Sequence, residues 1–164
     1  MDRSNFTIAT RTTYNKTIKE NENFCREVHP MGKSLTKKIL ESHFVKGSMV
    51  PGEEVFIKVD QTLTHDINAV MTYLAFEAIG LDRIRTECSV SYLDHNLLYV
   101  NNMTPDDHIY LQSAAKKFGV HVSRPGNGIC HTVHVSRFGK PGKISMGGDS
   151  HTPHGGSIGM LCIG

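Results

Sequence analysis

Residues 147–156 gather side chains that can do chemistry. This segment reads GGDSHTPHGG and carries the carboxylate of Asp149, the hydroxyl of Ser150 and the imidazole of His151. Carboxylates and imidazoles are the groups that enzymes use to move protons. The preceding apolar residues, 144–146, predict a strand, so the polar groups should lie at its carboxyl end, where open α/β sheets bind their ligands.

The same order, a strand and then polar residues, occurs twice upstream. Residues 53–59 alternate apolar and polar side chains, which predicts a strand running toward His65. Residues 89–93 predict another strand, which delivers Asp94 and His95. Taken singly, each cluster is more often turn or cap chemistry. Three such clusters on the same side of one sheet predict a shared pocket.

The elements that must position these residues alternate along the chain. The expected elements are helices at 34–45, 67–79, 104–118 and from 157 to 163, and a short strand at 120–123. Thr104 is expected to cap the third helix, and Gly80 and Gly119 to end the second and third. Strands alternating with helices of this length predict an α/β fold, a three-layer α/β/α arrangement with a largely parallel sheet.

The other histidines among the ten need separate explanations. Four have no polar partner nearby in the sequence and are expected to be solvated or packed: His29, His43, His108 and His121. His131 and His134 are three residues apart, which could place two metal ligands on one helical face. The segment HTVH lacks the glutamate of an HExxH zinc helix, so zinc is a secondary interpretation.

The four cysteines are scattered: Cys25, Cys88, Cys130 and Cys162. None belongs to a CxxC pair, so neither a zinc ribbon nor a redox dithiol is indicated. The last three lie in apolar neighbourhoods and are expected to be small core residues.

Composition bounds the remaining possibilities. The 164 residues, 38% of them hydrophobic, suffice for one domain with an adequate core. A net charge of +2 without a basic stripe makes nucleic acid a poor candidate partner, and no apolar run approaches the ~20 residues that span a bilayer. Residues 1–30 are polar, lack the core of a secretory signal and are expected to form a disordered leader. We expect a cytoplasmic protein, or a mitochondrial matrix protein if it is eukaryotic.

Four segments, in order and spacing, resemble the N-terminal α/β/α domain of the aconitase family. They are DQTLTHD at 60–66, YLDHN at 92–96, RPGNGICH at 124–131 and GGDSHTPHGGSIGMLCIG at 147–164. That family includes aconitate hydratase, homoaconitase and the large subunit of isopropylmalate dehydratase, and the resemblance covers residues 31–164. It implies reversible dehydration and rehydration of a hydroxy di- or tricarboxylic acid at a 4Fe-4S cluster, one iron of which acts as a Lewis acid.

The resemblance also implies roles for individual residues. His95 is similar to the acid that protonates the departing hydroxyl, with Asp94 holding its ring, and His131 resembles the family's second histidine on the hydroxyl side. The residues Asp149, Ser150 and His151 resemble those beside cluster and substrate. His65 takes the place that contacts a substrate carboxylate, at the start of a helix whose free amides favour an anion.

Two departures from the family pattern matter. Histidine at position 65 is more like the isopropylmalate and homoaconitate branch, whereas DSHTPHGG is closer to aconitase itself, so the substrate stays open. The family's cluster cysteines, substrate-binding arginines and serine base come later than residue 164, so the domain is expected to be incomplete at its C-terminus.

We therefore expect the N-terminal part of a hydro-lyase, completed by the remaining domains in cis or as a separate subunit. No cluster is expected to be held by this chain alone. Two alternatives stay open: a non-catalytic truncated remnant or complementing subunit with the same fold, and a small metal-dependent hydrolase that uses the His and Asp cluster directly.

Overall fold

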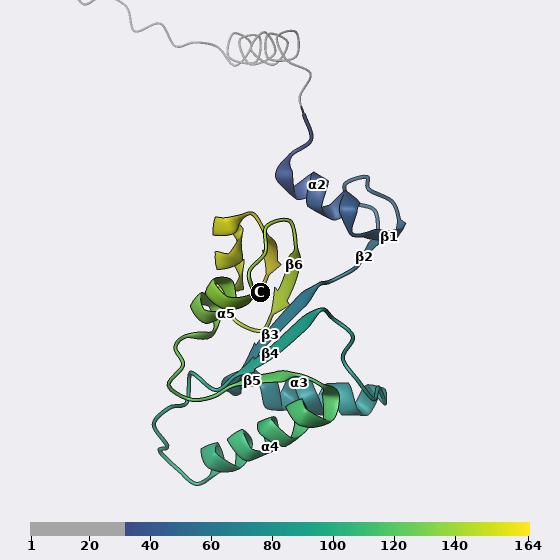
Figure 1. Cartoon of the computed structure of the whole chain (residues 1–164). Helices are drawn as coiled ribbons and strands as arrows, with labels where there is room; N and C mark the ends of the chain where they lie inside the picture. The colour runs from purple at the N-terminus through teal and green to yellow at the C-terminus, as the bar shows by residue number, and fades with distance from the viewer. Residues whose placement is uncertain (1–31) are drawn as a thin grey trace, which may run out of the picture. The chain divides into compact units, whose positions relative to one another are not determined.

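A parallel five-stranded sheet organises the chain, which the computed structural model describes for residues 32–164 (Figure 1). Its strands are β3 (Gln61–His65), β4 (Cys88–Tyr92), β5 (His121–Ser123), β6 (Ile144–Gly147) and β7 (Leu161–Ile163). They lie in the order β5-β4-β3-β6-β7, and every neighbouring pair is parallel. The carboxyl ends of all five strands therefore share one edge. The predicted leader at residues 1–30 lies outside the described residues.

Helices cover both faces of this sheet (Figure 1). The helices α3 (Asp66–Ile79) and α4 (Met103–Phe118) pack together on one face. The helix α5 (Cys130–Phe138) and the short 3₁₀ helix η1 (Thr152–Ile158) lie on the other. The predicted three-layer α/β/α fold is confirmed.

Two apolar cores hold the layers. On the α3–α4 face, Tyr73 stacks on Phe118 with ring centroids 6.0 Å apart, and Leu111 packs beside them. On the α5 face, Leu63 and Tyr92 belong to a buried cluster that also contains Val90 and Cys130. Because both faces are covered, strands β3 and β4 form a rigid platform for whatever follows them.

The N-terminal part of the described chain differs from the prediction. The expected helix at 34–45 ends early, as α2 (Leu35–Ser42), and the chain then enters β1 (Phe44–Gly47). That strand pairs antiparallel with β2 (Val55–Ile57) in a separate two-stranded sheet. The strand predicted at 53–59 is present in part as β2, but it does not belong to the parallel sheet, where β3 at residues 61–65 takes the expected place.

The C-terminal part also differs. The helix expected from 157 to 163 was wrong: η1 ends at Ile158, and the following residues pair with β6 as β7. Gly159 adopts a left-handed φ of 79°, which ends a helix, and the apolar residues after it are typical of a strand.

Helix ends on the other face follow the prediction in part. Gly80 and Gly119 end α3 and α4 in the left-handed region, with φ of 77° and 76°. The capping role predicted for Thr104 was wrong, because α4 begins at Met103 and the Asn101 side chain accepts from the Met103 and Thr104 amides at 3.0 and 3.3 Å.

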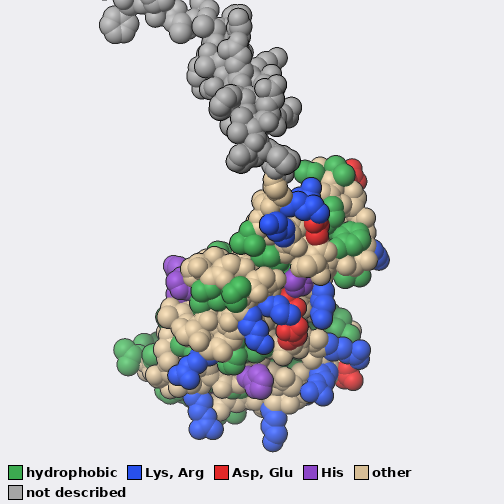
Figure 2. Space-filling view, turned by 45° about the horizontal axis from the view of Figure 1, so that its top comes forward, with side chains coloured by type: hydrophobic (Ala, Val, Ile, Leu, Met, Phe, Trp, Pro, Cys, Tyr) green, Lys and Arg blue, Asp and Glu red, His purple; other side chains and the backbone are tan. Residues whose placement is uncertain are grey.

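On the face shown in Figure 2, Lys and Arg side chains lie in separate groups, with a few acidic side chains near them. Within residues 32–164, no helix combines the length and the apolar character needed to cross a bilayer.

Candidate active site at the carboxyl edge of the sheet

Three strand ends and the first turn of α5 bring five of the predicted site residues together. The imidazoles of His65 and His95 stack with centroids 4.1 Å apart. His95 Nε2 lies 3.8 Å from Asp149 Oδ1, and His131 Nδ1 lies 3.1 Å from Asp149 Oδ2. Asp94 completes the set beside His95. Segments that follow β3, β4 and β6 and the first turn of α5 thus converge on one cluster.

Asp94 fixes the tautomer of His95. His95 Nδ1 lies 2.9 Å from Asp94 Oδ1, and a carboxylate can only accept, so Nδ1 carries the proton. The other oxygen, Asp94 Oδ2, accepts from the Cys130 amide at 2.6 Å, in the first turn of α5. His95 Nε2 is therefore the ring nitrogen that remains for a ligand.

Asp149 lies beside His131. Its Oδ2 is 3.1 Å from His131 Nδ1, an ion-pair distance, and accepts a hydrogen bond from the His151 amide at 2.8 Å. Burial by itself raises the pKa of this carboxyl. The hydrogen bond from the His151 amide and the nearby imidazoles of His131 and His65 outweigh burial and lower the pKa. Asp149 therefore stays ionised, and its Oδ1 faces His95.

His65 is held by backbone and amide groups. Its Nε2 lies 3.1 Å from the Gly148 carbonyl oxygen and 3.1 Å from Asn68 Nδ2, and Asn68 also donates to that carbonyl. Its backbone amide meets Asn68 Oδ1 at 3.4 Å, so the two residues bracket the start of α3. His65 Nδ1 is buried and has no hydrogen-bond partner among the described residues.

Two predicted residues lie at the rim. The side chain of His151 is 72% exposed and stacks on His131 at 4.9 Å. Ser150 is exposed, with its hydroxyl 3.3 Å from His151 Nδ1. The edge of His154 also meets His131, at 5.9 Å. Ser150, His151 and His154 therefore surround the cluster rather than line its interior.

The pair His131 and His134 does not form one ligand face. His131 lies in the cluster, whereas His134 is on the buried side of α5 and is only 2% exposed. Gln61 Nε2 donates to the Phe138 carbonyl, so Gln61 Oε1 accepts from His134 Nε2 at 3.1 Å, and Tyr92 donates to His134 Nδ1 at 3.0 Å. Burial lowers the pKa of His134 to about 4, which keeps the ring neutral.

The described cysteines are free and lie on different elements. Cys88 begins β4, Cys130 begins α5 and Cys162 is the middle residue of β7. Burial raises the pKa of all three thiols, most strongly at Cys130, where Asp94 and Asp149 add to the effect. None of them is set up as a reactive thiolate.

Sequence reasoning missed two buried partners of the cluster. Asp66 accepts from the backbone of His95, and His108, expected to be solvated or packed, contacts Asp66 from α4 with 3% exposure. His108 and Asp66 are 42 residues apart, so no local pattern could have paired them. The helical prediction for residues 104–118 was the only available signal.

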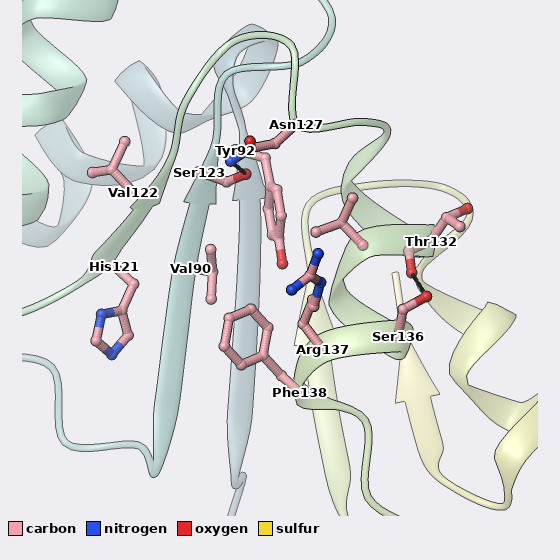
Figure 3. Close-up of a pocket in the computed structure, with 11 residues that line it drawn as sticks. Val90, Tyr92, His121, Val122, Ser123, Asn127, Thr132, Ser136, Arg137 and Phe138 are labelled. Carbon is pink, nitrogen blue, oxygen red and sulfur yellow. Dashed lines mark hydrogen bonds between the residues drawn. The ribbon is translucent and has the colours of Figure 1, made fainter.

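A groove of ≈700 Å³ lies elsewhere, between β4, β5 and α5. Figure 3 shows Arg137 and Phe138 entering it from α5, across from Val90 and Tyr92. None of the clustered His and Asp residues lines it. We therefore place the candidate site by its chemistry and not by cavity volume.

Comparisons with known proteins identify the family of this chain. A model of the aconitase family, described as aconitate hydratase, matches residues 37–164. An aconitase-ribosomal protein bL21m fusion protein of Schizosaccharomyces pombe is 32% identical over 151 residues, covering 80% of this chain and 16% of the relative. The 3-isopropylmalate dehydratase large subunit 2 of Archaeoglobus fulgidus is 31% identical over 134 residues, covering 82% and 32%. The mitochondrial homocitrate dehydratase of Saccharomyces cerevisiae is 29% identical over 151 residues, covering 80% and 19%.

The chain belongs to the aconitase family, a family of hydro-lyases. It spans only 16% to 32% of the length of these three relatives.

Proposed function

We propose that this chain forms the part of a hydro-lyase active site that binds a hydroxy di- or tricarboxylate and moves a proton at its hydroxyl group. The observation that carries this proposal is that two His–Asp pairs, His95 with Asp94 and His131 with Asp149, lie next to each other. Asp94 holds the His95 ring through Nδ1, which leaves Nε2 for the ligand, and Asp149 Oδ2 lies 3.1 Å from His131 Nδ1.

His95 is the proposed acid for the departing hydroxyl. Asp94 holds the ring at Nδ1, so that Nε2 faces the site where the proton is to be delivered. Positioned proton transfer of this kind contributes ~10² to 10⁴ in rate. His131, beside Asp149, is the proposed second histidine on the hydroxyl side.

Anion binding is assigned to the start of α3. His65 lies where this helix begins, and free helix amides attract negative charge. His65 Nε2 lies 3.1 Å from both the Gly148 carbonyl oxygen and Asn68 Nδ2, which hold the ring at this position. Ser150 and Asp149 are the proposed further substrate contacts, and His151 closes the rim.

The 4Fe-4S cluster implied by the family resemblance does not fit the described residues of this chain. Such clusters need several thiolates around one point. The described thiols lie on β4, α5 and β7, and burial raises their pKa. Cluster ligands would have to come from residues outside the described range or from another chain.

A metal-dependent hydrolase is the second candidate. Its supporting observation is that potential ligand atoms of Cys130, His131 and Asp149 lie within 4.8 Å of one another, as do those of two neighbouring triplets. The raised pKa of the Cys130 thiol works against it. Tight zinc binding by the purified chain would favour this candidate, while a catalytically silent complete protein would favour a non-catalytic remnant.

The test is dehydration activity of the natural protein, purified anaerobically by antibodies raised against residues 37–164. Citrate, isocitrate, homocitrate and 3-isopropylmalate are supplied in turn, and the ultraviolet absorbance of the unsaturated product is followed. We expect one of these acids to be dehydrated. A preparation with full iron content that acts on none of them would contradict the proposal.

The relatives include mitochondrial enzymes, such as the homocitrate dehydratase of Saccharomyces cerevisiae. A matrix location is therefore part of the proposal for a eukaryotic source, with the cytoplasm as the alternative. Cell fractionation followed by immunoblotting distinguishes them.

A further inference from the structure

The segment that carries Asp94 and His95 has no regular structure of its own. Residues 93–102, between β4 and α4, contain neither helix nor strand. Four neighbouring side chains in it are exposed apolar groups, Leu97, Leu98, Tyr99 and Val100, with 49% to 88% exposure. Something other than a ladder of backbone hydrogen bonds must therefore fix the position of His95.

Asp66 binds the backbone of this segment. Its Oδ1 accepts from the His95 amide at 3.1 Å, and its Oδ2 accepts from the Asn96 amide at 2.8 Å. Asp66 is the first residue of α3, and its side chain is fully buried. Because α3 is packed against α4, the carboxylate is a fixed anchor rather than a mobile one.

His108 holds Asp66 in turn. His108 Nε2 lies 3.0 Å from Asp66 Oδ2, so this nitrogen donates to the carboxylate. The other nitrogen, Nδ1, lies 3.2 Å from the hydroxyl of Tyr99, a residue of the same segment. The Tyr99 ring meets His108 edge-on at 5.5 Å. The chain of contacts thus leaves the segment at His95, passes through Asp66 and His108, and returns at Tyr99.

This network does more than fill space. Burial alone raises the pKa of Asp66, but bonds from the Asn96 amide, His108 and the His95 amide outweigh it and lower the pKa, so the residue is a carboxylate. A buried carboxylate is stable only while its donors remain in place. Asp66 Oδ1 is also 3.9 Å from His95 Nδ1.

We propose that Asp66 and His108 are positioning residues that hold residues 94–96 so that His95 stacks on His65 and faces Asp149. The catalytic meaning of this placement rests on the proposed function of His95. The placement itself is a property of the free chain and is tested there, without substrate, so that it can fail separately from the proposed function.

The test is hydrogen exchange by NMR on the full chain and on His108→Phe, which removes the donor to Asp66. We expect the amides of His95 and Asn96 to exchange about 10- to 100-fold faster, as loss of a bond in a charged network allows. The ring signals of His65 and His95 should shift as their stacking loosens. The conservative variant His108→Gln keeps an N–H donor and should restore part of the protection.

Phe118→Leu is the matched control, because it weakens the α4 core without touching Asp66. It should speed exchange across α4 but leave His95 and Asn96 no more affected than their neighbours. Equal behaviour of the two variants, or no recovery with His108→Gln, would overturn the proposal.

One measurement keeps the proposal testable even if His108→Phe does not fold. In the unmodified chain, ¹⁵N spectra of the His108 ring should show a proton on Nε2 that exchanges slowly. An Nε2 without a proton would be incompatible with donation to Asp66 and would refute the positioning role.

Discussion

Asp94 holds the His95 ring and also accepts from the Cys130 amide in another segment, which ties the ring to the start of α5. Asp149 accepts from the His151 amide of its own turn after β6 and lies 3.1 Å from His131 Nδ1. Pre-organised groups of this kind contribute most when charge develops in a transition state. We therefore expect substitutions of these single residues to lower turnover more than they weaken substrate binding.

His95→Ala should lower kcat by ~10² to 10⁴ in the active natural protein, with KM changed only a few-fold. Asp94→Asn should act in the same direction but more mildly, because the ring is misoriented and not removed. Steady-state kinetics with the preferred acid measures both. His121→Ala, at an exposed position of β5, is the control and should behave as the unmodified protein. Near-normal kcat in both site variants would remove His95 from the mechanism.

The buried His134 predicts a loss of stability in mild acid. The unfolded chain takes up a proton at this ring near the ordinary histidine pKa of 6.5, while the folded chain does so only near about 4. Between these values the unfolded state binds more protons, so the free energy of unfolding falls as pH falls, by about 3 kcal/mol in total. Urea unfolding from about pH 7 to about pH 4.5 measures most of this window.

His134→Gln tests the assignment because an amide can donate to Gln61 and accept from Tyr92 but does not titrate in this range. The variant should show a much flatter dependence over the same window. The carboxylates of Asp60, Asp66 and Asp149 have pKa values below the ordinary aspartate value of 3.8, so they add their own losses at lower pH, outside this window. An unchanged slope in His134→Gln would show that another group titrates.

At the scale of elements, close approach between the end of β6 and α3 sets the position of His65. A Cβ at Gly148 would overlap the side chain of Asn68, which bonds both to His65 and to the Gly148 carbonyl. Gly148→Ala should therefore cost about 1 to 3 kcal/mol of stability and displace His65. Urea unfolding and the His65 ring signals report the two effects.

Gly156→Ala is the matched control for this substitution, because a Cβ there meets nothing within 4 Å and the position has no left-handed φ. It should leave both readouts unchanged. If Gly148→Ala were as mild as Gly156→Ala, the close packing of β6 against α3 would not be what places His65.

Local patterns predicted some elements and missed others for a physical reason. The strands at 88–92 and 144–147 precede the polar segments that they were predicted to deliver, and both glycine helix ends lie where expected. Residues 55–57 carry the same alternation as a sheet strand, but they pair with β1. Only long-range pairing decides which of two adjacent strand-like segments joins the sheet.

Some contacts of the candidate site could likewise be predicted from the sequence, and others could not. The carboxyl ends of parallel strands share an edge, so the meeting of His65, Asp94, His95 and Asp149 followed from the parallel sheet that the sequence predicted. The roles of Asp66 and His108 did not, because their contact depends on how α3 packs against α4. The inward turn of His134 likewise depends on which side of α5 faces the sheet.

At the scale of the whole molecule, the described thiols determine what the chain can hold alone. Thiolates are the cluster ligands, and burial raises the pKa of Cys88, Cys130 and Cys162 on three separate elements. We therefore expect anaerobic reconstitution of the purified 164-residue chain to leave well under one 4Fe-4S cluster per chain. Iron and sulfide analysis measures this, and a stoichiometric, stable cluster would contradict it.

The central claim is that His65, His95 and His131 form one binding site for a hydroxy polycarboxylate. The most direct measurement is an NMR titration of the full chain with citrate, homocitrate and 3-isopropylmalate, following the ring signals of every histidine, with tricarballylate as the acid that lacks the hydroxyl. We predict that one hydroxy acid shifts these three rings together and saturably, more strongly than tricarballylate, while the rings of His121 and His134 stay unchanged. Shifts confined to other histidines, or none with any of the acids, would contradict it.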